Sequence, residues 1–423
     1  MIMMISENLA PEAHAIVRMG KALMSCGAET YRVRLSMEQV AAAVGVERLQ
    51  SQVTLSEVTV TLFQGDDFRT QVGNVHSVGV NGDKLCQLQS LASDLMPGTS
   101  PDEVEERLDA IDAREKLYAP WVQALVAAIA CSAVAFLNNA WAAEVLGVFA
   151  GAFLGQFLRA NFNRFRINVY LTTLSAALLA AFKYMAVTDF VGWLTLDPSS
   201  HRAGLVPALI FLVPGFPLVN ALLDLVKTDI TAGLSRLAYA FMILASASAA
   251  LLLVTWIGGA TPDPLPPPAL PTPLWWVLAL AASGIGVTGW AIMFNVRFRG
   301  ALLAGASALV GNGVRLVLLE LAGAPSWLAA TAGCLVIGVL ATVLATRARL
   351  AGVTLTVPAA LIMLPGASAY RALVYFSRGN VVSMMSNASL AIFTIAGMGI
   401  GLSLARILSD PEWILDRRRT LSA

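Results

Sequence analysis

From Pro120 onward the chain is a succession of apolar stretches, each about as long as a membrane-spanning helix. A helix needs about 20 mainly apolar residues to cross the hydrocarbon core of a bilayer. Ten segments meet this requirement, and they begin near Trp121, Trp141, Ile167, Ala203, Ala232, Leu274, Ala301, Ser326, Gly352 and Val381. With 57% hydrophobic and only 13% charged residues, the chain has too little polar surface for a water-soluble body, which carries about 25% charged residues. The sequence therefore predicts a mainly α-helical polytopic membrane protein with ten transmembrane helices.

Residues 1–116 have a different composition and indicate a small α/β domain. Residues 1–119 hold 17 acidic and 10 basic side chains, about half of all the charges in the chain. Apolar spacing, β-branched runs and helix-start residues predict helices and strands at 11–26, 28–44, 53–55, 58–63, 68–80, 81–95 and from Pro101 onward. The N-terminus lacks the cationic stretch and long apolar core of a secretory signal, so we expect this domain in the cytoplasm.

A proline-rich loop divides the apolar part into two sets of five helices. The loop, residues 258–273, contains the stiff sequence TPDPLPPPALPTP, which suits a spacer outside the cytoplasm. We expect the first five-helix half at 117–257, the second at 274–405, and a basic cytoplasmic tail at 406–423. Because each half has an odd number of spans, the two halves are expected in opposite orientations across the membrane.

Loop charges support this topology. With both termini inside, the cytoplasmic side receives most of the basic residues, namely Arg159, Arg164, Arg166, Lys227, Arg236, Arg297, Arg299, Arg347, Arg349 and Arg417 to Arg419. The outer side receives chiefly Arg202, Arg371 and Arg378. This is the positive-inside distribution expected of an inner-membrane protein with cytoplasmic N- and C-termini.

A sequence repeat connects the fourth span of each half. The segment Pro207–Gly215 reads PALIFLVPG, and Pro358–Gly366 reads PAALIMLPG, with both prolines and the final glycine at a constant offset of 151 residues. One explanation of the repeated sequence is a chance pair of proline kinks. The alternative is an inverted repeat with two interrupted helices, whose freed backbone groups are tolerated only where they line a cavity or are buried in protein. That arrangement is typical of secondary transporters.

Polar side chains near the breaks and deep in the spans are candidate substrate contacts. Arg315 lies well inside span 7, where an ionisable group is costly and suggests a functional site, and its guanidinium can hold a carboxylate; a structural pairing with Glu320 is the alternative. The candidate substrate-binding residues are Pro214, Gly215, Asn220, Asn312, Arg315, Pro365, Gly366, Ser368, Tyr370, Arg371 and Asn387. Asp224 and Glu320 are the candidates for carrying a proton, although Asp224 would also suit an ordinary solvated loop.

Several function classes are disfavoured. No GxxxxGK[ST] phosphate-binding motif appears, so transport would draw on a gradient rather than on ATP. The four cysteines and three histidines show no metal-ligand spacing, and no nucleophile motif with a His/Asp set indicates a hydrolase. A net charge of +1 without a basic patch argues against nucleic-acid binding. We expect no enzyme activity, no metal and no cofactor.

The segment Leu23–Val33, LMSCGAETYRV, followed by Val44-Gly45-Val46, resembles the opening motif of the ThrE-type threonine/serine exporters. The helix from Asn81 and the later Leu364-Pro365-Gly366 extend the resemblance over nearly the whole chain. The resemblance implies a cytoplasmic N-terminal domain followed by about ten spans, and in some bacteria the two parts form two subunits associated with succinate export. It also implies proton-driven export of small hydrophilic amino acids.

Within the motif, Glu29, Thr30 and Arg32 admit two interpretations. Glu29 and Thr30 fall in the first turn of a helix, where capping and domain packing explain them; a sensing or gating role is the alternative. We interpret the chain as a threonine/serine exporter, an antiporter that works by alternating access. Its expected partners are protons, lipid, a small solute and further copies of itself in a homo-oligomer. A dicarboxylate exporter and a membrane-anchored ligand receptor are the competing hypotheses.

Overall fold

The structure is a computed structural model that describes residues 9–75, 78–195, 203–258 and 270–409. These residues form two compact units. Unit 1 contains the described residues up to Leu117 together with Phe216–Leu237, and unit 2 contains Tyr118–Gly215 and Ala238–Ser409. Each unit is described separately below.

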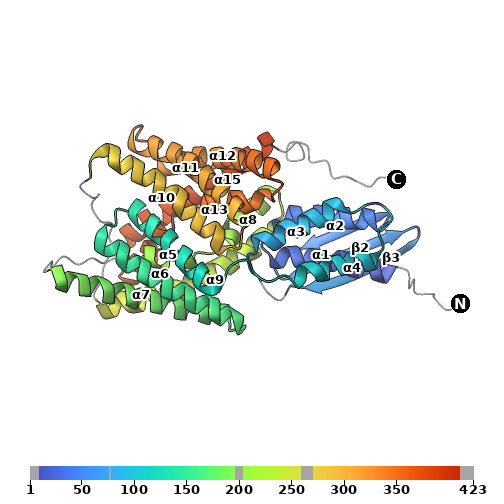
Figure 1. Ribbon diagram of the computed structural model, residues 1–423, viewed down its shortest axis with the longest axis horizontal. Helices are drawn as coiled ribbons and strands as arrows, with labels where there is room; N and C mark the ends of the chain where they lie inside the picture. The colour runs from blue at the N-terminus through green and yellow to red at the C-terminus, as the bar shows by residue number, and fades with distance from the viewer. Residues whose placement is uncertain (1–8, 76–77, 196–202, 259–269, 410–423) are drawn as a thin grey trace. The chain divides into compact units, whose positions relative to one another are not determined.

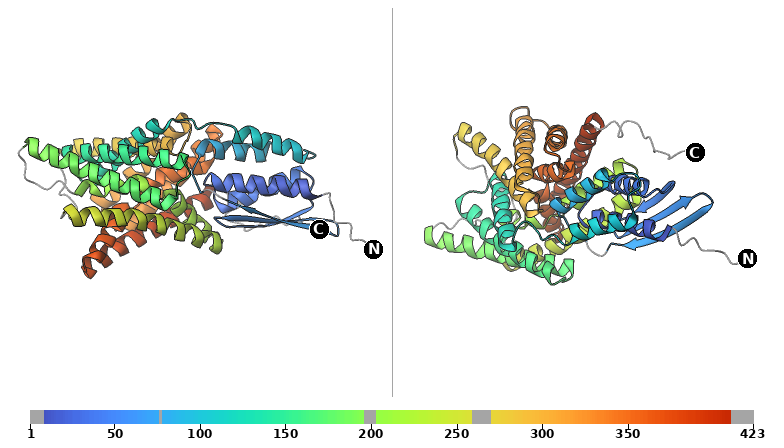
Figure 2. Two further views of the ribbon diagram at one scale, coloured as in Figure 1. Left: turned by 90° about the horizontal axis from the view of Figure 1, so that it is seen from below. Right: turned by 45° about the vertical axis from the view of Figure 1, so that its right-hand side comes forward.

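Unit 1 is built from three layers. Helices α1 (Ala10–Ser25) and α2 (Thr30–Ala43) pack against a three-stranded antiparallel sheet, and α3 (Gly82–Asp94) and α4 (Pro101–Asp112) pack on the other side of α1 (Figures 1 and 2). Apolar side chains at helical spacing on α1, including Ile16, Met19 and Leu23, are fully buried. Their burial against the sheet supplies the main driving force for this packing.

The sheet order is β1 (Arg48–Val53), β2 (Glu57–Gln64) and β3 (Asp67–Asn74). Alternate residues of β2 are fully buried on the face toward the helices, as period-2 patterning requires. The first strand was predicted at 53–55, which is wrong, because β1 ends at Val53 and pairs from Arg48 onward. Most side chains of its sequence, RLQSQV, are polar and partly or fully exposed, so β1 lacks the apolar alternation that indicates a strand.

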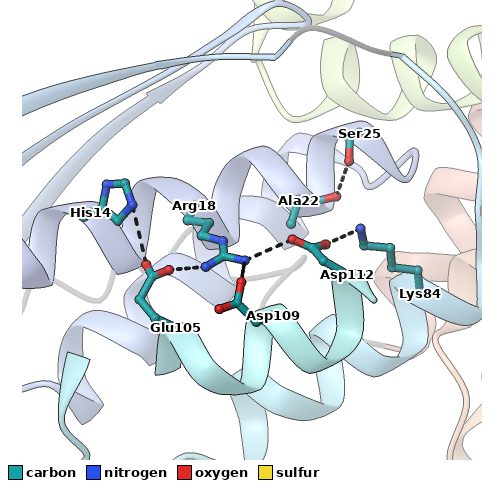
Figure 3. A network of polar contacts seen from close by, with 8 residues as sticks. All are labelled: His14, Arg18, Ala22, Ser25, Lys84, Glu105, Asp109 and Asp112. Atoms are coloured by element: carbon teal, nitrogen blue, oxygen red, sulfur yellow. Dashed lines mark hydrogen bonds and ion pairs between the residues drawn. The ribbon is translucent and has the colours of Figure 1, made fainter. Parts of the chain in front are cut away.

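A network of ion pairs connects α1 to α4 (Figure 3). The Arg18 guanidinium donates to Glu105, Asp109 and Asp112, and Lys84 donates to Asp112 as well. Burial by itself would raise the pKa of the Asp112 carboxyl, but the hydrogen bonds from Lys84 and Arg18 outweigh it and hold that pKa below its usual value. The network therefore stabilises the charged form of Asp112, and the Arg18 guanidinium offsets the repulsion among three carboxylates along one helix.

We expect Arg18→Gln to lower the stability of unit 1 by about 1 kcal/mol, a small value because the carboxylates are partly exposed. Because the pKa of Asp112 is lower in the folded state, its contribution is complete above the unfolded-state pKa of about 4 and is lost as pH falls through the folded value. The stability of the full-chain variant, measured by thermal unfolding, should therefore fall less steeply on acidification than that of the wild type. Arg107→Gln, which breaks an exposed pair with Glu103, is the control; equal effects of both variants would contradict this account.

Unit 2 is helical. The described residues contain eight helices long and apolar enough to cross a membrane. They are α5 (Pro120–Leu137), α6 (Ala142–Arg164), α7 (Val169–Thr195), α9 (Ile230–Gly258), α10 (Thr272–Met293), α11 (Phe298–Glu320), α12 (Ser326–Ala348) and α15 (Val381–Ser409). The first residues of α9, up to Leu237, belong to unit 1. These eight helices confirm a polytopic membrane protein, and each begins within three residues of a predicted start.

The other two predicted spans are interrupted. The span predicted from Gly352 consists of α13 (Gly352–Ala360), η4 (Leu361–Met363) and α14 (Gly366–Ser377), bent by 49° at the break, and counts as a ninth span if the pair is one span. The span predicted from Ala203 is built from the short pieces η2 (Ala203–Leu205), η3 (Pro207–Leu212) and α8 (Gly215–Val226). The count of ten spans and the inverted orientation of the halves stay predictions.

Small residues allow the helices of unit 2 to pack closely. In Figure 1, α5, α6 and α7 lie side by side, and so do α11, α12 and α15. The core between the first three helices consists largely of alanines with no exposed surface, namely Ala127, Ala128, Ala152, Ala176, Ala177, Ala180 and Ala181. Lipid chains are as apolar as these side chains, so close van der Waals packing supplies the association energy here.

Candidate functional site

The two Pro-Gly breaks have the same backbone geometry. Val213 has φ −62° and ψ 124°, and Leu364 has φ −64° and ψ 125°. After each of them the glycine amide, Gly215 or Gly366, donates to the carbonyl two residues earlier at 2.8 Å. The repeated sequence thus produces a repeated local structure, in which a 3₁₀ turn ends, the chain extends for two residues, and an α-helix begins.

The breaks contact each other within unit 2. A Cβ atom added to Gly215 would lie 2.2 Å from Cδ2 of Leu361, and one added to Gly366 would lie 3.5 Å from Val213. Any side chain at position 215 would therefore force the Leu361 side chain to move away. The proximity of the breaks is what the substrate-site prediction for Pro214, Gly215, Pro365 and Gly366 requires.

A small cavity lies at this contact. It is lined by Val134, Ile210, Phe211, Val213, Trp290, Met293, Phe294, Leu361, Leu364 and Gly366. Its volume of about 20 Å³ suffices for about one water molecule. An amino acid does not fit there in this conformation, so the arrangement of helices is closed around the breaks.

Asn312 and Arg315 form a polar chain in unit 2. The Asn312 amide nitrogen donates to the Ser283 hydroxyl on α10 at 2.8 Å, and Arg315 Nη1 donates to Asn312 Oδ1 at 3.2 Å. The Nε of Arg315 is buried and has no hydrogen-bond partner among the described residues. Glu320, the alternative structural partner, is exposed at the end of α11 and makes a longer-range electrostatic interaction with Arg315.

The predicted substrate contacts on α14 and α15 differ in burial and in hydrogen bonding. Tyr370 on α14 is fully buried, and its hydroxyl has no hydrogen-bond partner among the described residues. Ser368 is also buried and Arg371 is half-buried. Asn387 donates to the Ser383 carbonyl of its own helix at 2.9 Å. Their proposed contacts with a substrate stay predictions.

Arg159, which the loop charges assign to the cytoplasmic side, has a specific partner within unit 2. It was counted as a cytoplasmic loop charge, whereas it belongs to α6, and its Nη1 donates to the Phe211 carbonyl at 2.9 Å. Phe211 is in the 3₁₀ turn before the first break and lines the cavity. A counting rule that treats every arginine near a helix end as solvated cannot detect such a contact.

In unit 1, the N-terminal motif packs around a left-handed turn. Gly27 has φ +89°, which disfavours any residue with a Cβ, and it lets the chain reverse between α1 and α2. The Asn220 amide nitrogen from α8 donates to the Gly27 carbonyl at 2.9 Å. Asn220, predicted as a substrate contact, therefore uses this donor within unit 1, while its buried Oδ1 has no hydrogen-bond partner in the described part of the chain.

Asp224 caps helix α2 from a distant point in the sequence. Its Oδ1 accepts from the Thr30 amide at 3.2 Å, and its Oδ2 accepts from the Thr30 hydroxyl at 3.0 Å. Glu29 occupies the N-cap position without a side-chain cap bond. A carboxylate at a helix N-terminus is stabilised by the unpaired amides and the helix dipole, so the capping that the motif predicted is supplied by α8.

The same carboxylate pairs with a buried arginine. Arg236 Nε lies 2.9 Å from Asp224 Oδ2, and both side chains are only 2% exposed. Arg236 also donates to the Ala28 carbonyl at 2.8 Å, and the buried Glu29 interacts electrostatically with both charges. Two carboxylates therefore face one guanidinium. Asp224 is not a solvated loop residue, while its role in carrying a proton stays a prediction.

Further contacts join α2 to the turn between α8 and α9. Arg34 pairs with Asp229 at 2.6 Å, and the Lys227 ammonium lies 5.2 Å from the centre of the Tyr31 ring. Arg32 lies 5.6 Å from the same ring. The Glu29, Thr30 and Arg32 segment is therefore packed against Phe216–Leu237, which fits the packing interpretation of the motif. Its alternative role in sensing or gating stays a prediction.

Eight candidate membrane helices and two interrupted helices that meet at a cavity define a polytopic membrane protein of the transporter class. The sequence model of the ThrE family, described as a threonine/serine exporter, matches residues 14–258, and a second model, described as Threonine/Serine exporter, ThrE, matches residues 279–408. The chain belongs to the ThrE family of threonine/serine exporters.

Curated relatives agree with this family. The chain is 23% identical to a "Threonine/serine exporter" of Corynebacterium glutamicum over 95% of its own length and 82% of that protein. It is 24% identical to the "Probable succinate transporter subunit YjjP" of Escherichia coli over 57% of its own length and 93% of that protein. No solved structure matches the chain significantly.

We expect Asp224→Asn to destabilise the protein by about 3–5 kcal/mol, because it removes the carboxylate that pairs directly with the buried Arg236 guanidinium. Arg236→Gln should cost a similar amount, and the double variant should recover part of the loss because both charges of the pair are removed together. Thermal unfolding of the purified full chain measures this. Asp94→Asn, at an exposed position of α3, is the matched control, and a shift for Asp224→Asn no larger than the control's would disprove the structural role of the pair.

Proposed function

We propose that the protein is a secondary active exporter of threonine and serine in the inner membrane of a bacterium. The family and the exporter of Corynebacterium glutamicum support this substrate class. The observation that carries the proposal is the meeting of two equally built helix breaks at one cavity. A receptor that only anchors a ligand-binding domain has no need for interrupted helices that contact each other.

In this proposal, transport proceeds by alternating access. The cavity at the breaks holds about one water molecule, so a solute reaches it only after α14 and the 3₁₀ turns move apart. Helices α8 and α14 begin at Gly215 and Gly366, directly after the breaks, and the N-terminus of a helix favours a substrate carboxylate. Asn312 and Arg315 add donors, and Asp224 with Glu320 would couple transport to protons.

A dicarboxylate is the second candidate substrate. The relative from Escherichia coli is named as a succinate transporter subunit, and two carboxylates demand two cationic contacts. Arg315 and Arg371 were the expected pair, but neither lines the described cavity. Arg159 and Arg315, which lie in the long helices α6 and α11 of unit 2, are the cationic contacts proposed for this candidate.

The proposal is tested in liposomes that contain the purified protein and labelled threonine, with and without an imposed pH gradient. We expect gradient-dependent threonine movement that serine inhibits by competition. Movement of succinate alone would reassign the protein to dicarboxylates. If neither solute moves, in protein shown to be folded, export by this chain is refuted.

The same liposomes test proton coupling at Asp224. In Asp224→Asn protein that elutes as a single folded species, threonine exchange should persist while the pH gradient no longer drives net movement. Asp94→Asn serves as the control. Unchanged gradient dependence in Asp224→Asn would remove this residue from the coupling mechanism and leave its structural role alone.

A further inference from the structure

A second repeat relates helices α6 and α11, and it carries an arginine. Residues 155–159 read GQFLR and residues 311–315 read GNGVR. Both helices have 23 residues, and in both the arginine stands five residues before the last one. Each half of the protein thus has a glycine, a side-chain amide and an arginine at the same place in its second long helix.

The packing around this motif is also repeated. A Cβ atom on Gly155 would lie 2.9 Å from the Ala176 carbonyl of α7, and one on Gly311 would lie 2.8 Å from the Gly333 carbonyl of α12. Ala176 and Gly333 are both the eighth residue of their helices. The second and third helices of the two halves therefore cross at equivalent residues, which fixes the two arginines in equivalent surroundings.

Arg159 lies among polar groups that are not all satisfied. Its Nη1 bonds the Phe211 carbonyl at 2.9 Å, and Tyr239 and Tyr370 interact with it electrostatically. Gln156 is 5% exposed, and within the described residues neither its Oε1 nor the Tyr370 hydroxyl has a hydrogen-bond partner. Buried polar atoms without partners are costly, so this cluster retains hydrogen-bonding capacity for a further polar group.

Arg315 has matching surroundings in the second half. Asn312 replaces Gln156, accepts from Arg315 at 3.2 Å and donates to Ser283 at 2.8 Å. The buried Nε of Arg315 lacks a partner in the described part of the chain. A guanidinium with free donors beside a side-chain amide suits a carboxylate, which accepts two parallel hydrogen bonds from arginine.

We infer that Gln156 with Arg159 and Asn312 with Arg315 are two equivalent binding positions for the carboxylate of the transported solute. The inference rests on the proposed transport function and extends it to α6. In the proposed ten-span topology, α6 ends at the cytoplasmic face and α11 at the outer face. Each arginine is five residues, about 7–8 Å, from that end, so each half presents its arginine toward a different side. The carboxylate passes from the Arg159 position to the Arg315 position during export.

The test measures uptake of labelled solute in oriented vesicles. Two unlabelled competitors are compared, namely the solute itself and its carboxamide analogue, which for threonine is threonine amide. The ratio of their half-inhibitory concentrations measures carboxylate recognition and does not depend on the fraction of folded protein. We expect the wild type to prefer the carboxylate by about tenfold or more. Arg159→Gln should abolish this preference at the cytoplasmic face, and Arg315→Gln at the outer face.

The exposed arginines of the same helices provide matched controls, Arg164→Gln on α6 and Arg299→Gln on α11, which should keep the preference. Where a glutamine variant is inactive, Arg159→Lys or Arg315→Lys retains the charge and should show an intermediate ratio. If either glutamine variant keeps the same preference for the carboxylate as its control variant, the inference is wrong, although the proposed transport function still stands. A wild type that moves no solute removes the proposed function and the inference with it.

Discussion

In the apolar interior of a membrane every backbone amide and carbonyl needs a partner, and the two Pro-Gly breaks are the places where this chain gives up its helical partners. The chain compensates by placing the breaks against each other, with Gly215 in contact with Leu361. Arg159 supplies a donor to one of the freed carbonyls, that of Phe211. The cavity at the contact and the bend between α13 and α14 follow from these two interruptions.

Helix α8, which begins at the first break, also contributes a side chain to the core of unit 1. Ten residues after Pro214, α8 supplies Asp224 to unit 1, where it caps α2 and pairs with Arg236. Breaking a buried pair by removing one partner costs more than the pair contributes net. The Gly27 turn and the N-terminus of α2 therefore depend on one partner segment, which explains why the N-terminal motif and the short apolar helix α8 belong to one compact unit.

Much of the fold was predictable because apolar length and loop charge are local properties. The eight candidate spans follow from apolar length, the two interruptions from the Pro-Gly repeat, and most elements of unit 1 from residue spacing, whereas the polar strand β1 gives no apolar signal. The partners of the buried charges could not be predicted in this way. Arg159 and Arg236 were counted only as loop charges because their partners lie far away in the sequence, and the bond between Thr30 and Asp224 joins residues 194 apart. No single-sequence pattern reports such pairs, although the GQFLR and GNGVR repeat was visible and marked Arg159.

The two halves are proposed to be equivalent and oppositely oriented in the membrane, and chemical labelling from each side distinguishes this arrangement from a parallel one. Phe165 and Leu321 immediately follow α6 and α11 at equivalent positions, and they are 76% and 72% exposed. In a chain whose four native cysteines are replaced, Phe165→Cys and Leu321→Cys would be treated with a membrane-impermeant maleimide in intact cells and in inverted vesicles. The account predicts that Leu321→Cys reacts only in cells and Phe165→Cys only in inverted vesicles. Reaction of both from the same side would contradict it.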